Sequence, residues 1–217
     1  MSILSWLLDL LYPPKCVVCG KLLTVKAPVC PHCLDALPEF DGAAPSVRFT
    51  SGGAVSFFYE GKLRESFLRF KFGGSAYYAQ TYGAWMAHTI CDKLAGPYDV
   101  LTWAPVSRAR KRKRGYDQAA LLCRALGARL GLEPVQTLRK IKDPPAQSTL
   151  AGAEQRRANV SGAYRAKQPE RFAGKRVLII DDIVTTGATL AECSRTLLQA
   201  GASDVVYAAF AAPRKQD

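Results

Sequence analysis

The sequence predicts an α/β fold, a parallel sheet flanked by helices, with a small separate module at the N-terminus. From residue 98 onwards, short apolar runs alternate with longer segments of helical period, which is typical of βαβ units. The first forty residues instead hold four closely spaced cysteines and cannot bury a core of their own. We therefore expect two units, residues 1–40 and residues 54–217, with a Gly/Ala/Pro/Ser-rich linker over Asp41–Gly53.

Five strands are expected, each of them a short run of apolar residues. They are Ala54–Tyr59, Val100–Ala104, Pro134–Leu138, Arg176–Asp182 and Val205–Phe210. Because ligands of parallel sheets bind beyond the carboxyl ends of the strands, the loops after Ala104 and Asp182 should face one crevice.

Helices are expected where apolar residues recur at helical spacing. The apolar face of the first helix is formed by Leu63, Phe67, Leu68 and Phe70, and the helix ends at Gly73-Gly74. Its basic residues are expected to point outward: Lys62, Arg64, Arg69 and Lys71. The later helices are Ala76–Leu94, Asp117–Leu130 and one from about Ala188 to Ala200.

One stretch, Val177–Leu190, combines a buried strand with polar residues that suit ligand binding. Two carboxylates, Asp181 and Asp182, come where that strand should end. Hydroxyls, backbone N–H groups and a glycine follow, supplied by Thr185, Thr186, Gly187, Ala188 and Thr189. A turn that leads into a helix N-terminus can hold a phosphate, because its N–H groups and the helix dipole both attract anions.

The two carboxylates suit hydroxyls or a metal ion, since carboxylates repel phosphate. A phosphate next to two hydroxyls describes a ribose 5-phosphate. The alternative interpretation is an ordinary turn between a strand and a helix, in which a threonine caps the helix.

The segment Asp181–Thr189, DDIVTTGAT, resembles the 5-phosphoribosyl 1-pyrophosphate (PRPP) signature of type I phosphoribosyltransferases. The resemblance implies that Asp181 and Asp182 contact the ribose hydroxyls and that residues 185–189 cradle the 5-phosphate. It also implies that the loop after the first core strand holds the pyrophosphate with Mg²⁺. In this sequence the candidates for that role are Ser107, Arg108 and Arg114.

The basic run Arg108–Arg114 holds more cations than one pyrophosphate requires, because six of its seven residues are basic. The chain carries a formal net charge of +12, which favours polyanionic partners such as nucleotides, nucleic acid or anionic lipid. Either a solvated loop or a contact with single-stranded DNA explains the surplus.

Four of the seven cysteines form two Cys-x-x-Cys pairs, which can complete a tetrahedral zinc site. The expected ligands are Cys16, Cys19, Cys30 and Cys33. Disulfides and a redox-active pair are the alternatives, but no secretion signal is evident and a second pair favours structural zinc. His32 is expected to be a bystander. The remaining cysteines are expected in the core: Cys91, Cys123 and Cys193.

The first residues, MSILSWLLDLLYPP, predict a short amphipathic helix that ends at Pro13-Pro14. It either packs on the body of the protein or docks to a membrane or partner. No apolar run reaches the roughly 18 residues that a membrane-spanning helix needs.

Further segments narrow the resemblance. Arg114–Gln118, the segment from Gln147 to Asn159 and the DDIVTTGAT loop follow a four-cysteine finger in that order. This arrangement resembles the ComF-type proteins, in which the first segment usually reads Arg-Gly-Phe-Asn-Gln, so that Asp117 replaces an asparagine here. Asp143–Ser161 is expected to be a hood over the ligand, from which Arg156 and Arg157 could close on PRPP.

The ComF resemblance implies a cytoplasmic protein of natural transformation that takes part in DNA uptake, with a peripheral place at the inner face of the membrane as one option. Three molecular functions fit the sequence: a phosphoribosyltransferase, a PRPP-binding protein on the same fold, and a DNA-uptake factor that contacts single-stranded DNA or other uptake proteins. The sequence contains no residue that we recognise as activating an acceptor.

Overall fold

The computed structural model describes residues 13–25, 27–142 and 161–214. The predicted N-terminal helix lies outside these residues, as do Arg156 and Arg157 and nearly all of the predicted hood. No helix of the described part of the chain is both long enough and apolar enough to cross a bilayer.

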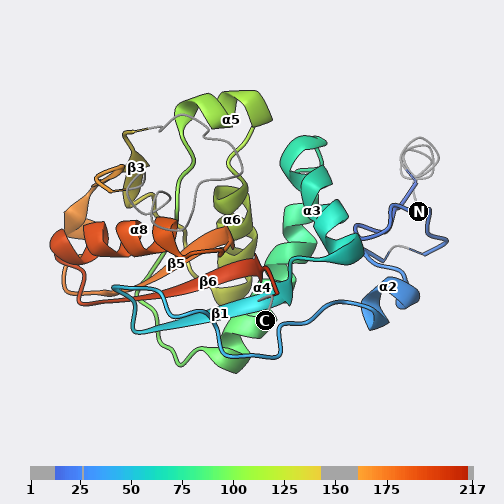
Figure 1. Ribbon diagram of the computed structural model, residues 1–217, viewed down its shortest axis with the longest axis horizontal. Coiled ribbons are helices and arrows are strands. Elements are labelled where there is room, and N and C mark those ends of the chain that lie inside the picture. Colours follow the sequence, from blue (N-terminus) through green and yellow to red (C-terminus); the bar gives the residue numbers. More distant parts are fainter. Residues whose placement is uncertain (1–12, 26, 143–160, 215–217) are drawn as a thin grey trace.

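The core is a four-stranded parallel sheet in the order β1-β6-β5-β2 (Figure 1). Its strands are β1 (Gly52–Phe58), β2 (Val100–Trp103), β5 (Arg176–Ile183) and β6 (Asp204–Ala212). The central strands are almost wholly apolar, as strands buried on both faces should be. The predicted α/β class is therefore confirmed, and four of the five predicted strands lie in this sheet.

Helices cover both faces of the sheet, so that alternate residues of β5 enter two different cores. Leu178 and Ile180 pack in the core that contains residues of α3 (Gly61–Phe72), α4 (Tyr78–Lys93) and α6 (Gln118–Leu130). Val177 and Ile179 pack in the other core, together with α8 (Ala188–Gln199). These four helices are the predicted ones. Cys123 and Cys193 are buried as expected, but Cys91 is exposed.

The predicted strand Pro134–Leu138 is largely absent. Only a single bridge joins Pro134 to Leu101, in which the N–H of Val135 donates to the Leu101 carbonyl (2.8 Å). The ladder stops there because the next donor, the N–H of Thr137, bonds the carbonyl of Val135 (3.0 Å) and not the backbone of β2. The chain then leaves the sheet and forms β3 (Leu138–Lys140), which pairs antiparallel with β4 (Tyr164–Ala166). A one-turn 3-10 helix, η1 (Pro169–Arg171), follows β4.

The basic run is a helix, α5 (Arg108–Arg114), and not the predicted loop. Ser107 caps its N-terminus by accepting a hydrogen bond from the backbone N–H of Arg110 (3.2 Å), and Gly115 ends it in the left-handed conformation. Four cations in its last turn lie near the negative end of the helix dipole. This helix cannot be predicted from apolar periodicity, because α5 has no apolar face.

The cysteine-rich module packs on α3, so not every basic residue of α3 faces solvent (Figure 1). The module contains one short helix, α2 (Pro31–Asp35), and its Val17 and Val18 join the core that α3 and α4 line. Ser66 donates a hydrogen bond to the carbonyl of Val17, and Arg69 donates to that of Val18. The prediction that Arg69 points to solvent is therefore wrong.

The predicted linker has no regular structure before β1, but it lies against the domain. Val47 is buried, and the carbonyl of Pro45 accepts a hydrogen bond from the Tyr207 hydroxyl (2.5 Å). Through these contacts the linker reaches the turn before α8, where Val47 meets Gly187.

Candidate functional site

Two adjacent carboxylates stand at the carboxyl end of β5. The strand continues through them to Ile183, one residue further than the sequence predicts. Asp181 Oδ1 accepts the N–H of Asp182 (2.8 Å), and Asp182 Oδ1 accepts the N–H of Ile183 (2.6 Å). These local bonds fix both side chains at the end of a central strand, where parallel sheets bind ligands.

The carboxyl group of Asp181 is in an unfavourable place for a charge. Burial is the main cause that raises its pKa well above the ordinary value, and the neighbouring charges of Asp182 and Asp117 raise it further. The N–H of Asp182 and the ammonium of Lys71 act in the opposite direction. A cluster of acids of this kind marks a site that is arranged for a ligand or a cation.

The turn after the carboxylates leads directly into α8. Gly187 is the N-cap, with φ +70°, and its carbonyl accepts the first helical hydrogen bond, from Ala191 (2.8 Å). Thr186 Oγ1 accepts the N–H of Ala188 (3.4 Å), and Thr185 is exposed. A Cβ on residue 187 would lie 2.9 Å from Val47 Cγ2. Glycine is thus required by both conformation and space.

Lys71 is a residue of this site that the sequence does not reveal. Its Nζ lies 2.8 Å from Asp182 Oδ2, and its side chain is only 14% exposed. The prediction that it points to solvent is wrong, because α3 ends beside the acids. No pattern in the sequence signals this contact, since Lys71 alternates with apolar residues in the same way as the exposed cations of α3.

The segment Arg114–Gln118 contacts the last turn of α3. The Tyr116 hydroxyl donates to the carbonyl of Phe70, and Gln118 Nε2 donates to that of Lys71 (3.4 Å). Arg114 bonds Gln118 Oε1 (2.9 Å) and lies over the ring of Phe72, 5.1 Å from its centroid. These side chains satisfy carbonyls that a helix C-terminus leaves unpaired.

Asp117, which replaces the expected asparagine, has a structural role. It is buried and is the N-cap of α6, where Oδ1 accepts the N–H of Ala120 (3.2 Å). Its other oxygen accepts the N–H of Val106 (3.1 Å), which fixes the loop after β2. Burial raises the pKa of Asp117, and these two hydrogen bonds oppose the shift.

A basic groove of about 700 Å³ lies at the outer edge of β2. Six cationic side chains from four parts of the chain line it: Arg108, Lys111, Arg124, Arg139, Lys140 and Lys167. Trp103 and the buried Asp117 also contribute to the wall. Because only Arg108 and Lys111 of these six belong to α5, the basic run is only a part of this surface.

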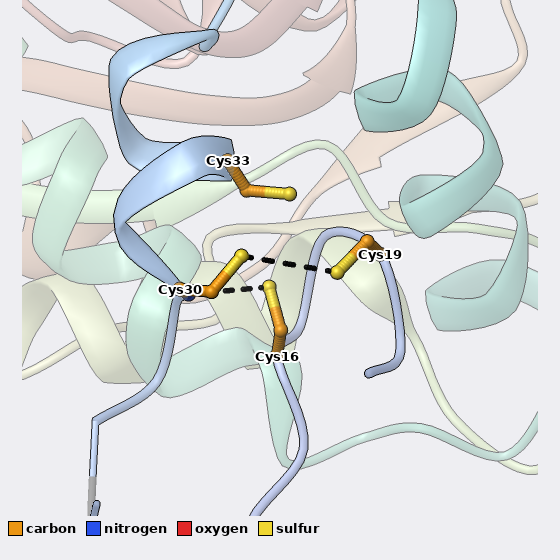
Figure 2. Close-up of side chains that lie close together, drawn as sticks. All are labelled: Cys16, Cys19, Cys30 and Cys33. Carbon is orange, nitrogen blue, oxygen red and sulfur yellow. Dashed lines mark hydrogen bonds between the residues drawn. The ribbon is translucent and has the colours of Figure 1, made fainter. Parts of the chain in front are cut away.

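The four cysteines of the N-terminal module converge on one point (Figure 2). Cys16 and Cys19 come from the first turn, and Cys30 and Cys33 from the start of α2. Their sulfur atoms all lie within 4.8 Å of one another, and those of Cys19 and Cys30 are 3.9 Å apart. His32 is exposed and does not belong to the cluster.

This geometry fits a tetrahedral zinc ion. With bonds of about 2.3 Å, the sulfurs around Zn²⁺ are separated by roughly 3.8 Å. Burial raises the pKa of the Cys16 thiol, but backbone hydrogen bonds from Cys19, Cys30 and Val18 outweigh it and lower the pKa to about 6. A thiolate is therefore favoured at Cys16, whereas burial and the neighbouring cysteines raise the pKa of Cys33, whose thiolate a bound metal ion would have to stabilise.

Comparison with known proteins agrees with both parts of the structure. A family model described as a phosphoribosyl transferase domain matches residues 113–217, and one described as a double zinc ribbon domain matches residues 7–44. The solved glutamine phosphoribosylpyrophosphate amidotransferase from B. subtilis is 22% identical, with a TM-score of 0.41, over 62% of this chain and 26% of that chain.

Three curated relatives bear names that refer to competence or to DNA utilization. Competence protein F of Haemophilus influenzae is 28% identical over 199 residues, which cover 88% of this chain and 82% of that protein. Competence protein ComFC of Bacillus subtilis is 29% identical over 66% of this chain and 56% of that protein. DNA utilization protein YhgH of Salmonella typhi is 35% identical over 49% of this chain and 46% of that protein, so the match spans less than half of either.

The protein thus combines a phosphoribosyltransferase-like domain with an N-terminal zinc ribbon, held by a structural zinc at its four cysteines. Together, these comparisons support a ComF-type protein with an N-terminal zinc ribbon, as the order of the motifs predicted.

Proposed function

We propose that this protein binds PRPP together with Mg²⁺ at the carboxyl end of β5. Asp181 and Asp182 would accept hydrogen bonds from the ribose hydroxyls. The backbone N–H groups and hydroxyls of residues 185–189 would hold the 5-phosphate: Thr185, Thr186, Gly187, Ala188 and Thr189. The observation that carries the proposal is the sequence of buried strand, fixed acids, glycine-capped turn and helix N-terminus.

The pyrophosphate would lie between the loop after β2 and the last turn of α3. Ser107, Arg108 and Arg114 remain the candidates from the loop. Ser107 Oγ accepts the N–H of Arg110, and a serine that accepts in this way would contribute to the pyrophosphate through its O–H or its backbone N–H, both of which are donors. Mg²⁺ would neutralise part of the charge of the pyrophosphate, and the buried acids nearby suit a site that works with a bound cation.

In the cell, we propose a cytoplasmic role in DNA uptake during natural transformation, with contact at the inner face of the membrane. The names of competence protein F and ComFC support this role. The basic groove at β2 is the candidate surface for single-stranded DNA, because its cations could follow a phosphate backbone. The zinc ribbon, residues 1–40 in our division, would be free to contact other uptake proteins, while residues 54–217 bind PRPP.

A second candidate function is enzymatic. The match to a phosphoribosyl transferase domain favours transfer of ribose 5-phosphate from PRPP to an amine, a base or water, with release of pyrophosphate. In that case the site must stabilise an electron-poor ribose and the leaving pyrophosphate. A screen of nucleobases and amines for PRPP-dependent pyrophosphate release separates a transferase from a protein that only binds PRPP.

Isothermal titration calorimetry with PRPP tests the central proposal directly. We expect binding in the presence of Mg²⁺, much weaker binding after chelation, and loss of binding in the double variant Asp181→Ala, Asp182→Ala. Removing a hydrogen bond to a charged acceptor costs about 1.5–3 kcal/mol each. A folded double variant with the affinity of the wild type would refute the site.

A further inference from the structure

The fold places the ammonium of Lys71 beside the two adjacent acids Asp181 and Asp182. It lies 2.8 Å from Asp182 Oδ2, where both side chains are largely shielded from water, at 14% and 17% exposure. Its Nζ also lies over the ring of Phe67, 5.1 Å from the ring centroid. Lysine is rarely buried without a purpose, because removing an ammonium from water is costly.

The backbone that carries Lys71 is held from two directions. On one side, Tyr116 and Gln118 bond the carbonyls of Phe70 and Lys71. On the other side, earlier turns of α3 bond the zinc ribbon through Ser66 and Arg69. Figure 1 shows α3 standing beyond the carboxyl ends of the strands. The last turn of α3 is therefore fixed, and the flexible side chain of Lys71 is the part that can move.

The ion pair occupies an acceptor that a ribose would need. Asp182 Oδ1 already accepts the N–H of Ile183, and Oδ2 is the oxygen that Lys71 holds. A hydroxyl that donates to Oδ2 must therefore share this oxygen with the ammonium or replace the ammonium. At the same time, the Lys71 ammonium acts on both acids of the pair: it bonds Asp182, and its charge opposes the rise in the pKa of Asp181.

We propose that Lys71 is a ligand-binding residue that exchanges partners. Its ammonium pairs with Asp182 in the free site and turns to the pyrophosphate of PRPP when the ribose hydroxyls take its place. The proposal rests on the PRPP site described above. The pyrophosphate is the favoured partner because α3 contacts the segment Arg114–Gln118, whereas the turn assigned to the 5-phosphate leads into α8.

The variant Lys71→Met tests this exchange, because methionine keeps the volume and removes the charge. Its affinity is measured by calorimetry for three probes: PRPP with Mg²⁺, inorganic pyrophosphate with Mg²⁺, and ribose 5-phosphate. We expect roughly ten- to hundredfold weaker binding of the first two, the range for losing a charged hydrogen bond. Binding of ribose 5-phosphate should be unchanged or tighter, since Asp182 is released.

Lys62→Met is the matched control, because Lys62 lies in the first turn of the same helix and is exposed. It should bind all three probes as the wild type does. Lys71→Arg keeps the charge and should recover most of the pyrophosphate affinity. The zinc content and the unfolding temperature of each variant show whether the fold is retained.

The possible failures are distinct. An equal loss for all three probes in Lys71→Met would mean that Lys71 only supports the structure, and unchanged pyrophosphate binding would mean that it is only a counter-ion of Asp182. Either result overturns the exchange while the PRPP site stands. A wild-type protein that binds none of the three probes refutes the PRPP site itself, and the exchange with it.

Discussion

Gly187, the N-cap of α8, lies directly against Val47 of the segment that precedes β1. Its φ is +70°, and a Cβ added there would come 2.9 Å from Val47 Cγ2. The turn that we assign to the 5-phosphate is therefore shaped from two places in the chain that are far apart in sequence. It depends both on a left-handed backbone and on the buried side chain of Val47.

We predict that Gly187→Ala destabilises the protein and weakens PRPP binding. The left-handed conformation costs a residue with a Cβ about 1–2 kcal/mol, and the close approach to Val47 adds to that cost. Chemical denaturation measures the first effect and calorimetry the second.

Gly174→Ala is the control for this prediction. Gly174 has nearly the same φ, +69°, but a Cβ there would meet no atom within 4 Å. Gly174→Ala should lower the unfolding free energy only by the cost of the left-handed conformation, and it should keep PRPP binding. If the two variants were equally stable, the contact with Val47 would have no energetic effect.

We predict that Asp181→Asn stabilises the fold while it abolishes or weakens PRPP binding. The pKa of Asp181 is raised in the folded protein, so its ionised form opposes folding at any pH above the unfolded value of about 3.9. The gain in unfolding free energy should therefore be present at neutral pH and vanish as the pH falls towards 4.

Denaturation of Asp181→Asn and wild type at several pH values checks the sign of this effect. Asp182→Asn is the comparison, because it loses the ion pair with Lys71 and should not gain stability. A variant Asp181→Asn that is less stable than the wild type at neutral pH would contradict the assigned environment.

The zinc ribbon should hold about one zinc ion per chain. Metal analysis of protein purified without added metal measures it, and Cys16→Ser should release the ion and lower the unfolding temperature, because the site stabilises the module. Cys91→Ser, at an exposed cysteine outside the cluster, should change neither. Four metal-free, reactive thiols in the wild type would contradict the zinc site.

The contact between the zinc ribbon and the domain depends on Ser66, which donates to the carbonyl of Val17 and shares a hydrogen bond with the Tyr82 hydroxyl. Ser66 and Tyr82 are fully buried. Ser66→Ala deprives the buried Tyr82 hydroxyl of this partner and leaves the Val17 carbonyl with only the long bond from Arg69 (3.4 Å), so it should cost about 1–3 kcal/mol.

Tyr82→Phe should cost less than Ser66→Ala, because the bond from Ser66 to Val17 survives. Urea denaturation of the two variants gives the order. The opposite order would show that the bond of the Tyr82 hydroxyl contributes more to stability than the bond from Ser66 to the zinc ribbon.

Single-stranded DNA should bind the basic groove with an affinity that falls as salt rises. On a single strand the logarithm of affinity falls by roughly 0.7 per neutralised phosphate for each unit of log salt, so Arg108→Ser, Lys111→Ser, Lys167→Ser together should flatten the slope by about 2. Fluorescence anisotropy of a labelled oligonucleotide over a salt series measures it.

The triple variant Arg112→Ser, Lys113→Ser, Lys175→Ser removes the same charge from exposed positions that do not line the groove. It should keep nearly the wild-type slope. If both triple variants flatten the slope equally, the net charge of the protein and not the groove governs binding. If the groove variant keeps the wild-type slope, DNA binds at another surface.

The sequence predicts well those features whose physical cause is local. The run Val177–Ile180, the two acids and the glycine turn before α8 are contiguous. Their order alone predicts a strand, polar residues at its carboxyl end and the N-terminus of a helix. Conversely, α5 is missed because its stability comes from a cap at Ser107 and not from an apolar face. The strand at Pro134 is wrongly predicted because hydrophobicity does not report that the N–H of Thr137 bonds Val135 and not the backbone of β2.

By itself, then, the sequence determined the α/β class, the four zinc ligands and the segment Asp181–Thr189. Each of these features depends on neighbouring residues or on a fixed spacing between residues. Only the tertiary structure decided which distant groups meet. Lys71 pairs with Asp182 because α3, held between the zinc ribbon and the segment Arg114–Gln118, ends beside β5. Such contacts depend on how whole elements pack, and no local pattern encodes them.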